Sequence, residues 1–247
     1  MDLGIAGRRA LVAASSSGLG LATARALVDA GCKVVVSGRD ADRLAAAASD
    51  LEGSVPVIAD VSTPAGAEAL VAEAHVALGG VDVLVTNAGG PPPGRFADTD
   101  VDQYAAALDL NLMSVVAMCK AAVPPMQERG WGRVVAITSI SVRQPIGELI
   151  LSNTARAGAT AFLKTMALEV AGDGVTVNSV QPGYHATARL LDVYREGIDE
   201  LADQLPTKSV GVADDFGRVC AFLCSESAKF ITGAALPVDG GSHKGLQ

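Results

Sequence analysis

Residues 13–20 combine the residue types and the spacing of a phosphate-binding turn. They read Ala-Ala-Ser-Ser-Ser-Gly-Leu-Gly and lead from a short apolar run directly into an Ala-rich helical pattern. A helix N-terminus offers free N–H groups and the positive end of the helix dipole, which favour an anion such as a pyrophosphate. The Ser hydroxyls would add donors, and the Gly residues would allow close approach of the backbone. Because Gly- and Ser-rich helix caps are common, an ordinary cap remains the alternative for this turn taken alone.

Arg39 stands where a dinucleotide site usually selects its cofactor. It ends the second apolar run, roughly twenty residues after the glycine-rich turn. An acid at this place usually binds the ribose 2′-hydroxyl of NAD. A guanidinium suits a 2′-phosphate instead, so we expect NADP, with NAD disfavoured. A solvated Arg that caps a turn is the alternative.

Short apolar runs alternate with amphipathic stretches along the chain, and these elements must position the turn. The strand candidates are Arg9–Ala13, Lys33–Ser37, Val55–Ala59, Val81–Thr86, Arg133–Thr138, Gly174–Val180 and Ala234–Val238. The helix candidates are Gly18–Ala30, Asp40–Leu51, Pro64–Leu78, Asp102–Arg129, Ser152–Gly172 and Asp214–Ser225. This alternation predicts an α/β, Rossmann-like doubly wound parallel sheet of about seven strands, with helices on both faces.

No linker or low-complexity tract divides the chain, so we expect residues 1–247 to form a single dinucleotide-binding domain. Residues 183–212 break the alternation as a long polar segment, interrupted by Pro206. A loop of this length in a compact domain is usually functional, and we expect it to be a substrate lid. A helical excursion without a gating role is the alternative.

The composition argues against several classes of protein. The 247 residues are 49% apolar and 4% aromatic, which favours a Val- and Ile-rich sheet covered by Ala-rich helices. A formal charge of −8 is the wrong sign for a nucleic-acid partner, and no continuous apolar run reaches the roughly 18 residues of a membrane span. Residues 1–4 lack the pattern of a secretory signal, so we expect a cytoplasmic protein.

The four Cys residues form no CxxC pair. Cys220 and Cys224 lie one helical turn apart, where a metal or redox pair is possible. Buried free thiols on a packed helix are the favoured interpretation, and we expect no metal site.

Together these patterns resemble the short-chain dehydrogenase/reductase family over nearly the whole chain. Ser17-Gly18-Leu19-Gly20 resembles the glycine motif of the family, and Asp60-Val61 resembles its adenine contact. Asn87-Ala88-Gly89 resembles its fourth-strand motif, and Asn111 within 109–112 resembles its active-site Asn. Ser139 resembles the catalytic Ser of the family, and Pro182-Gly183 with Thr187 resembles its nicotinamide loop. Residues 231–241 resemble its C-terminal signature.

The resemblance implies a set of site residues. The cofactor would contact Ser15, Ser16, Ser17, Gly18, Leu19, Gly20, Arg39, Asp60, Val61, Asn87, Ala88, Gly89, Arg156, Pro182, Gly183 and Thr187. The catalytic positions would be Asn111, Ser139, Ser152 and Arg156. By the same resemblance the long helices 102–129 and 152–172 would pair with other copies in a homo-oligomer, a dimer or a tetramer.

Two departures from the family pattern stand out. The glycine motif of the family opens with Thr-Gly, where this chain has Ala13-Ala14, and the added methyl at a tight turn would weaken or shift cofactor binding. The family places Tyr thirteen residues after its catalytic Ser and Lys four residues later, and these positions are Ser152 and Arg156 here. The intact pattern at 166–169 keeps the alignment in register.

In the family's reaction a hydride passes between nicotinamide and a carbonyl carbon while Tyr exchanges a proton with the oxygen. The Ser polarises that oxygen, the Lys lowers the Tyr pKa and holds the ribose, and the Asn anchors a water relay. A phenol has a reference pKa of about 10, and an aliphatic hydroxyl is far less acidic. Arg can bind ribose hydroxyls but cannot deprotonate, so it cannot relay protons.

A replacement acid could come from Tyr184, His185 or Tyr194. Aromatic packing beside Pro-Gly is the alternative for the first two, and Tyr104 is expected to pack elsewhere. Glu148 precedes Ser152 in the pocket wall, where a solvated carboxylate is the favoured interpretation.

The leading hypothesis is therefore an NADP-dependent oxidoreductase, similar to 3-oxoacyl-carrier-protein reductases, that acts on a small carbonyl or alcohol through an altered proton relay. An NADP-binding protein without dehydrogenase activity is the second. A lyase similar to halohydrin dehalogenases is disfavoured, because those proteins keep Tyr and lose the nucleotide loop. A purely structural subunit is the remaining alternative.

Overall fold

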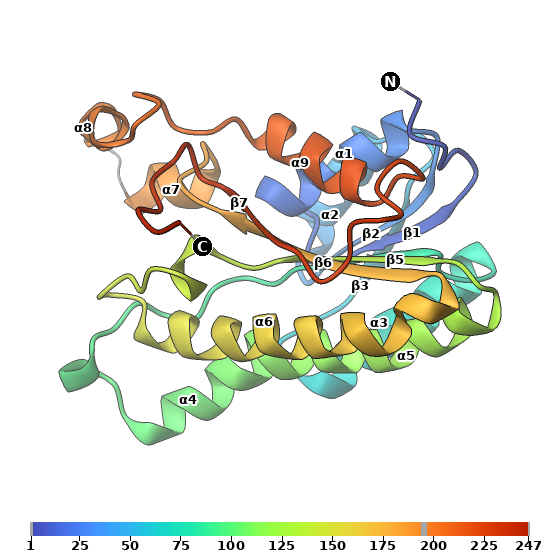
Figure 1. The fold of residues 1–247 in the computed structure, drawn as a ribbon, viewed down its shortest axis with the longest axis horizontal. Coiled ribbons are helices and arrows are strands. Elements are labelled where there is room, and N and C mark those ends of the chain that lie inside the picture. Colours follow the sequence, from blue (N-terminus) through green and yellow to red (C-terminus); the bar gives the residue numbers. More distant parts are fainter. Residues whose placement is uncertain (1, 194–196, 247) are drawn as a thin grey trace.

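Seven parallel strands form the centre of the molecule (Figure 1). The computed structural model describes residues 2–193 and 197–246 of the chain. The strands are β1 (Arg9–Val12), β2 (Lys33–Gly38), β3 (Val55–Ile58), β4 (Val83–Thr86), β5 (Gly132–Ile137), β6 (Val175–Pro182) and β7 (Ala235–Val238). Their spatial order is β3-β2-β1-β4-β5-β6-β7, which confirms the predicted doubly wound, Rossmann-like sheet.

Helices cover both faces of the sheet (Figure 1). One face carries α1 (Gly18–Asp29), α2 (Ala41–Ser49) and α9 (Ala213–Leu223), and the other carries α3 (Pro64–Leu78), α5 (Ser114–Glu128) and α6 (Ile150–Val170). The helices α1 and α9 approach closely because residue 217 is Gly, where a Cβ atom would overlap the carbonyl oxygen of Ala22. The core is correspondingly split into two apolar layers, one on each side of the buried strands.

The topology fixes where a ligand can bind. The chain winds outward in both directions from the pair β1 and β4, so the connections after these two strands diverge at the carboxyl edge of the sheet. Such a divergence leaves a crevice outside the strand ends. The glycine-rich turn follows β1 and the 87–90 turn follows β4, so both lie at this crevice.

The single helix predicted over 102–129 is instead interrupted. It consists of α4 (Val101–Leu108), a π-helical turn at Asp109–Met113 and α5. A π-helical turn inserts an extra residue into a helix and is frequent at functional sites. Here it contains Asn111, whose side-chain nitrogen donates a hydrogen bond of 2.9 Å to the Gly89 carbonyl.

The helical stretch Val101–Glu128 is 28 residues long and, within the described part of the chain, the one helix apolar enough by length and composition to cross a membrane. Its residues Met118, Cys119 and Met126 are buried in the core layer under the sheet. Part of the stretch thus packs in the core, and a single helix of this kind is weak evidence for a membrane span.

The segment 183–212 contains two short helices, α7 (Ala188–Val193) and α8 (Ile198–Gln204). Its first part contributes Thr187, Ala188 and Leu190 to the wall of a large cavity. The helices fit the expected helical excursion as well as a lid, and whether the segment opens and closes stays a prediction.

All four Cys side chains are buried and free. Burial raises the pKa of the Cys220 thiol on α9 to about 12, which keeps it protonated at neutral pH. Within the described residues no cluster of three His, Cys, Asp or Glu side chains could hold a metal ion. These observations fit thiols that serve as small core side chains.

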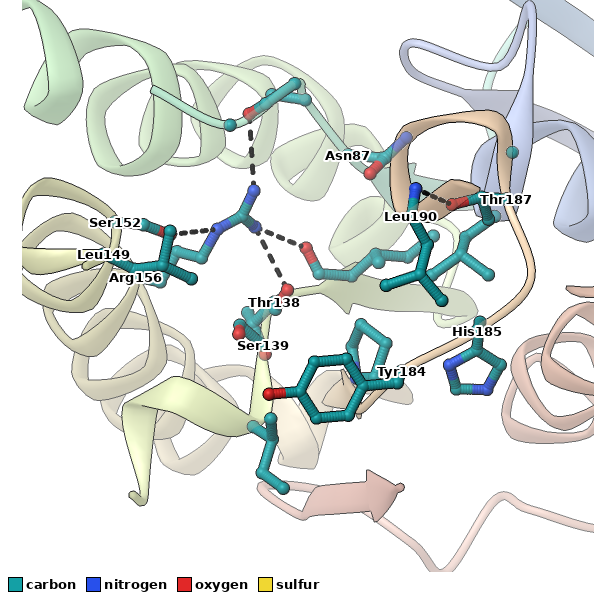
Figure 2. Close-up of a pocket in the computed structure, with 18 of the residues that line it drawn as sticks. Asn87, Thr138, Ser139, Leu149, Ser152, Arg156, Tyr184, His185, Thr187 and Leu190 are labelled. Atoms are coloured by element: carbon teal, nitrogen blue, oxygen red, sulfur yellow. Dashed lines mark hydrogen bonds between the residues drawn. The ribbon is translucent and has the colours of Figure 1, made fainter. Parts of the chain in front are cut away.

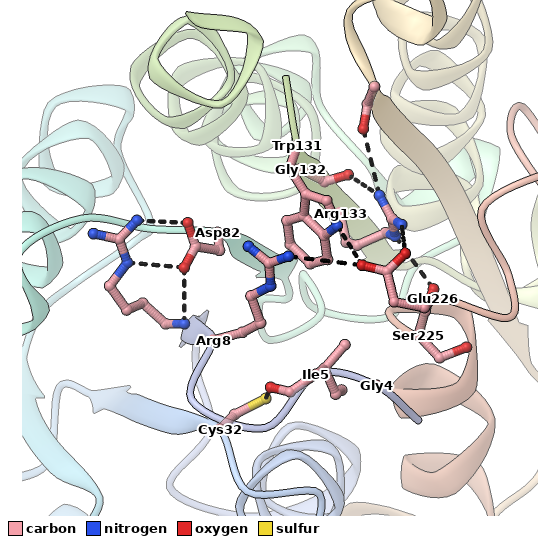
Figure 3. Close-up of polar contacts among 12 residues, drawn as sticks. Gly4, Ile5, Arg8, Cys32, Asp82, Trp131, Gly132, Arg133, Ser225 and Glu226 are labelled. Atoms are coloured by element: carbon pink, nitrogen blue, oxygen red, sulfur yellow. Dashed lines mark hydrogen bonds and ion pairs between the residues drawn. The ribbon is translucent and has the colours of Figure 1, made fainter. Parts of the chain in front are cut away.

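A polar network closes the amino-terminal end of the sheet, opposite the crevice (Figure 3). The Trp131 ring lies between two guanidinium groups, 3.7 Å from that of Arg8 and 4.3 Å from that of Arg133. Glu226 joins them, because it accepts a 2.7 Å hydrogen bond from the indole N–H and lies 3.6 Å from both guanidinium groups. Arg133 itself is only 2% exposed, so its charge depends on this carboxylate.

We expect Glu226→Ala to destabilise the fold by about 1–3 kcal/mol, because it leaves the buried Arg133 and the indole N–H without their carboxylate. Chemical denaturation at pH 7 measures this. Glu68→Ala, on an exposed face of α3, is the control and should change the free energy of unfolding by at most about 0.5 kcal/mol. Equal effects of the two substitutions would contradict a stabilising role of Glu226.

Candidate active site

A cavity of about 680 Å³ opens at the carboxyl edge of the sheet (Figure 2). It brings together most of the site residues predicted from the sequence: Ser17, Gly18, Leu19, Gly20, Asn87, Ala88, Gly89, Ser139, Ser152, Arg156, Pro182, Gly183 and Thr187. The other predicted residues, which lie outside this lining, are Ser15, Ser16, Arg39, Asp60, Val61 and Asn111.

The first turn of α1 forms one end of the cavity. Ser17 precedes the helix in an extended conformation, and its side chain makes no capping hydrogen bond in the described structure. Gly18 has a left-handed φ of 59°, and a Cβ atom at Gly20 would lie 2.6 Å from the Ala14 carbonyl oxygen. The turn therefore needs both glycines, and it presents backbone N–H groups at a helix N-terminus, as a phosphate site requires.

Ala14 adopts a left-handed φ of 47°, which costs a residue with a Cβ atom roughly 1–2 kcal/mol. Two hydrogen bonds of 3.0 Å hold it there. Its N–H donates to the Ser37 hydroxyl, and its carbonyl accepts from the Asn87 side chain. Asn87 thus ties the turn after β4 to the glycine-rich turn, which is a positioning role in addition to its place in the cavity wall.

The prediction that the Ser15 hydroxyl donates to a phosphate is wrong. This side chain is fully buried, donates to the Val12 carbonyl at 2.7 Å and accepts from the Ser37 N–H at 2.9 Å. These two hydrogen bonds join β1 to β2, so the Ser15 hydroxyl does not point toward a ligand. Ser16 lies nearer the surface, where a Cβ atom at Gly38 would lie 2.8 Å from its hydroxyl.

Arg39 and Asp60 lie beyond the cavity lining, at the exposed ends of the neighbouring strands β2 and β3. The Ser62 N–H donates to Asp60 at 2.9 Å, and this bond, supported by the positive charge of Arg39, lowers the pKa of the Asp60 carboxyl. Val61 is buried in the core layer. Arg39 is therefore a solvent-accessible cation on the same edge as the glycine-rich turn.

Arg156 lies across two strand ends (Figure 2). Its Nη1 donates to the carbonyls of Ile137 at 3.1 Å and Thr138 at 3.2 Å, where β5 ends. Its Nη2 donates to the Gly89 carbonyl at 3.3 Å, and its Nε donates to the Ser152 hydroxyl at 3.2 Å. The guanidinium is half-buried beside the cavity, and these four acceptors fix its plane.

Ser152 and Ser139 bring two hydroxyls to the same cavity. Ser152 accepts from Arg156, and Ser139 accepts a 3.1 Å bond from the Ser141 N–H. Asn111 stands behind this wall, since it is buried and contacts the cavity through the Gly89 carbonyl. Its side-chain oxygen has no hydrogen-bond partner within the described residues.

Of the proposed replacement acids, Tyr184 and His185 both line the cavity. The His185 ring is buried and meets the edge of Phe216 at a centroid distance of 5.1 Å, and burial lowers the pKa of this imidazole. Tyr194 lies outside the described residues. Tyr104 does not line the cavity, and its hydroxyl lies 3.3 Å from that of Thr99.

Glu148 forms part of the cavity rim and pairs with Arg95 at 2.6 Å. Both side chains are more than half exposed. A backbone hydrogen bond and the Arg95 contact lower the pKa of the Glu148 carboxyl, so it is ionised at neutral pH. This agrees with the solvated carboxylate expected from the sequence.

Sequence reasoning missed the contact that shapes the rim. The Gly94 N–H donates to the Glu148 carbonyl at 2.7 Å, and the Ile150 N–H donates to the Gly94 carbonyl at 3.3 Å. This pairing brings Pro93 and Leu149 into the cavity wall. The three consecutive prolines at 91–93 were a signal, because such a run is stiff and extended.

The sequence of this chain matches those of known proteins over nearly its whole length. A sequence profile described as "Enoyl-(Acyl carrier protein) reductase" matches residues 13–243. The Homo sapiens protein "Dehydrogenase/reductase SDR family member 4" is 34% identical over 249 residues, which cover 98% of this chain and 90% of that protein. The chain belongs to the short-chain dehydrogenase/reductase family.

Two other members of this family are informative. The acetoacetyl-CoA reductase of Cupriavidus necator is 37% identical over 170 residues, which cover 68% of each chain. The structure of L-sorbose reductase from Gluconobacter frateurii, complexed with NADPH and L-sorbose, superposes with a TM-score of 0.95 at 32% identity and full coverage of both chains. The matched family members are oxidoreductases, and the fold of this chain is theirs.

The lowered pKa of His185 predicts a specific pH dependence of stability. Because burial keeps the imidazole neutral in the folded state, its contribution is present above the ordinary pKa of 6.5 and is lost as the pH falls below it. We expect the free energy of unfolding of the wild type to fall more steeply between pH 7.5 and 5 than that of His185→Gln. Urea denaturation across this range measures the difference, with His75→Gln on α3 as the same chemical change outside the cavity. Parallel curves for the wild type and His185→Gln would contradict it.

Proposed function

We propose that this protein is an NADP-dependent oxidoreductase that interconverts a small carbonyl compound and its secondary alcohol through an altered proton relay. The observation that carries the proposal is that one cavity joins the N-terminus of α1 to the hydroxyls of Ser139 and Ser152. A dinucleotide bound at the first would extend toward a reacting oxygen held by the second.

The residues present fit NADP. The first turn of α1 and its glycines suit the pyrophosphate, and the room beside Gly20 and Gly38 is too small for any side chain. Arg39 is exposed at the end of β2, where a 2′-phosphate would lie. When bound, NADPH supplies a hydride to the carbonyl carbon. The NADPH in the structure of the L-sorbose reductase supports this cofactor choice.

The relay is altered because Ser152 and Arg156 occupy the positions where the family motif has Tyr and Lys. The Ser152 hydroxyl can donate a hydrogen bond but is too weak an acid to deliver a proton at neutral pH. Arg156 keeps a positive charge beside the reacting oxygen, yet four acceptors hold its N–H groups and it does not deprotonate. Positioning and hydrogen-bond stabilisation would remain, while general acid catalysis worth about 10²–10⁴-fold needs another source.

The cavity lining and the relatives support the proposed substrate class. Hydroxyls and a guanidinium converge at its inner end, and Ile140, Ile146 and Leu149 make part of its wall apolar. A small carbonyl or alcohol with an apolar part, such as a 3-oxoacyl group, fits this lining. The match to an acetoacetyl-CoA reductase supports that class.

A second candidate function is an NADP-binding protein without dehydrogenase activity. The same substitutions at Ser152 and Arg156 favour it, because they remove the usual acid while leaving the nucleotide end of the cavity in place. This candidate predicts tight NADPH binding with no turnover over a broad panel of carbonyl compounds.

The remaining expectations stay predictions. We propose a homo-oligomer, a dimer or a tetramer, in the cytoplasm, with no nucleic-acid or membrane partner. The acidic composition, with a formal charge of −8, supports the part that concerns nucleic acids.

We expect the wild type to bind NADPH at least about tenfold more tightly than NADH, because only the 2′-phosphate can form a charge-assisted bond with Arg39. Arg39→Ala should remove this preference by weakening NADPH binding and leaving NADH binding unchanged. Fluorescence titration gives both dissociation constants, and Arg218→Ala on the exposed face of α9 is the matched control. Equal affinity of the wild type for the two cofactors would contradict the NADP assignment.

The double substitution Ser152→Tyr with Arg156→Lys tests the altered relay. If the cavity is that of a reductase whose acid has changed, the double variant should reduce at least one compound of a carbonyl panel with a kcat no more than about tenfold below that of the wild type, because a Tyr at 152 with a Lys at 156 supplies the acid of the family motif. NADPH affinity should stay within a few-fold of the wild type. Ser152→Tyr alone, which keeps Arg156, is the control for the Arg-to-Lys change. A double variant that binds NADPH and reduces no compound of the panel would contradict the reductase cavity.

A further inference from the structure

We propose that Tyr184 is the catalytic acid of this cavity and donates its phenolic proton to a substrate oxygen bound by the hydroxyls of Ser139 and Ser152. This inference deepens the proposed function and rests on it. Three observations support it. The hydroxyls of Ser139 and Ser152 both accept hydrogen bonds and so can donate to a ligand. The side chains of Tyr184 and His185 point to opposite sides, and the other acids that line the cavity are buried and neutral or already ionised.

The hydrogen bonds of the two serines leave their protons for a ligand. Ser152 accepts from the Arg156 Nε–H and Ser139 accepts from the Ser141 N–H, so each hydroxyl must direct its own O–H elsewhere. The helical hydroxyls of Thr154 and Thr160 each donate to the carbonyl four residues earlier. Among the described residues, Ser152 on the same helix makes no such bond, and it lines the cavity together with Ser139.

Two hydroxyl donors that face one cavity can bind one oxygen and stabilise the negative charge that develops on it. The Arg156 guanidinium strengthens the Ser152 O–H as a donor, because its Nε–H bond draws electron density from the hydroxyl oxygen. The oxygen then still needs a proton, which neither serine can supply at neutral pH.

The backbone fixes the direction of Tyr184. The Gly183 N–H donates to the Val238 carbonyl at 3.0 Å, and the Gly211 N–H donates to the Tyr184 carbonyl at 2.8 Å. The short bridge between His185 and Gly211 makes this stretch strand-like, so adjacent side chains point to opposite sides. Figure 2 shows the outcome, with the Tyr184 hydroxyl directed toward Ser139 and the His185 ring directed away.

The competing acids are less suited. His185 is buried against Phe216, and burial lowers its pKa, which makes it neutral at pH 7. Glu148 is ion-paired with Arg95 at the rim and is already ionised. A phenol with a reference pKa of about 10 keeps its proton at neutral pH and can release it beside a cation.

The proton balance is simple in the direction of reduction, with NADPH as the reductant. The O–H bond of Tyr184 breaks and a new O–H bond forms on the substrate oxygen as the carbonyl carbon is reduced. The tyrosinate then takes a proton from water that enters the open cavity. In the direction of oxidation the alcohol proton passes to the tyrosinate.

The test compares Tyr184→Phe with Tyr104→Phe, the same chemical change outside the cavity lining. Carbonyl reduction is measured from pH 6 to 10 on the compound of a carbonyl panel that the wild type reduces fastest. We expect Tyr184→Phe to lower kcat about 10²–10³-fold, to abolish the fall of kcat at high pH, and to leave the NADPH dissociation constant within a few-fold. Tyr104→Phe should keep the wild-type profile.

A second readout needs no cofactor. Tyrosinate absorbance of the free protein is titrated for the wild type and for Tyr184→Phe, and the difference between the curves isolates one of the three Tyr residues. We expect this phenol to ionise below the ordinary value of about 10, because it shares the cavity with the Arg156 cation. Ionisation at or above about 10 would overturn the role of Tyr184.

The serine part is tested by Ser152→Ala and Ser152→Thr. Loss of the donor should lower kcat by about tenfold or more, and Thr, which keeps the hydroxyl, should restore most of it. Equal activity of Ser152→Ala and the wild type would overturn the two-hydroxyl site.

The outcomes distinguish a failure of the proposed Tyr184 role from a failure of the proposed oxidoreductase function. If the wild type binds NADPH and reduces no compound of the panel, the proposed oxidoreductase function fails and the acid role falls with it. If the wild type is active and Tyr184→Phe keeps its kcat and pH profile, only the role of Tyr184 is overturned. A loss confined to His185→Gln would then assign the acid to His185.

Discussion

The contact on which the candidate site depends is the one between the Arg156 guanidinium and the backbone carbonyls that end β5 and follow β4. These carbonyls belong to Ile137, Thr138 and Gly89, which lie at or just beyond the carboxyl ends of the two strands. A guanidinium has five donors in one plane and can serve several such acceptors at once, whereas an ammonium has three. The cation thereby joins the segments that follow the neighbouring strands β4 and β5, and its side chain forms part of the cavity wall.

Other features follow from that contact. Because Arg156 lies one helical turn after Ser152 on α6, its Nε reaches the Ser152 hydroxyl and determines which way that hydroxyl donates. Because the Gly89 carbonyl accepts from both Arg156 and Asn111, the π-helical turn between α4 and α5 is linked to the same point. The wall from Gly89 to Ser152 is thus one connected hydrogen-bonded unit.

The sheet and its order could be predicted because alternating apolar runs and amphipathic stretches admit few topologies. The break in the 102–129 helix could not, since the apolar pattern runs through it unchanged and the contact between Asn111 in the π-helical turn and the Gly89 carbonyl joins residues far apart in the sequence. The site was predictable where its side chains follow strand ends, as at Asn87 and Ser139. It was not predictable at Ser15, whose hydroxyl is used by a pairing of β1 with β2 that local sequence does not reveal. Nor could adjacent residues such as Tyr184 and His185 be told apart before the bridge to Gly211 fixed their directions.

The side chains of Ser152 and Arg156 match as hydrogen-bond acceptor and donor. If Arg156 were Lys, its three donors could not serve all three carbonyls together with the Ser152 hydroxyl, and that hydroxyl would lose the bond that turns its proton toward the cavity. If residue 152 were apolar, the Arg156 Nε–H would lack its acceptor in a half-buried place, which costs free energy. The match therefore stabilises the inner wall of the cavity whatever reaction takes place there. Together with the strained conformation at Ala14, which two hydrogen bonds maintain, it supports the proposal of a cofactor-binding cavity that keeps the architecture of the family while its proton donor differs.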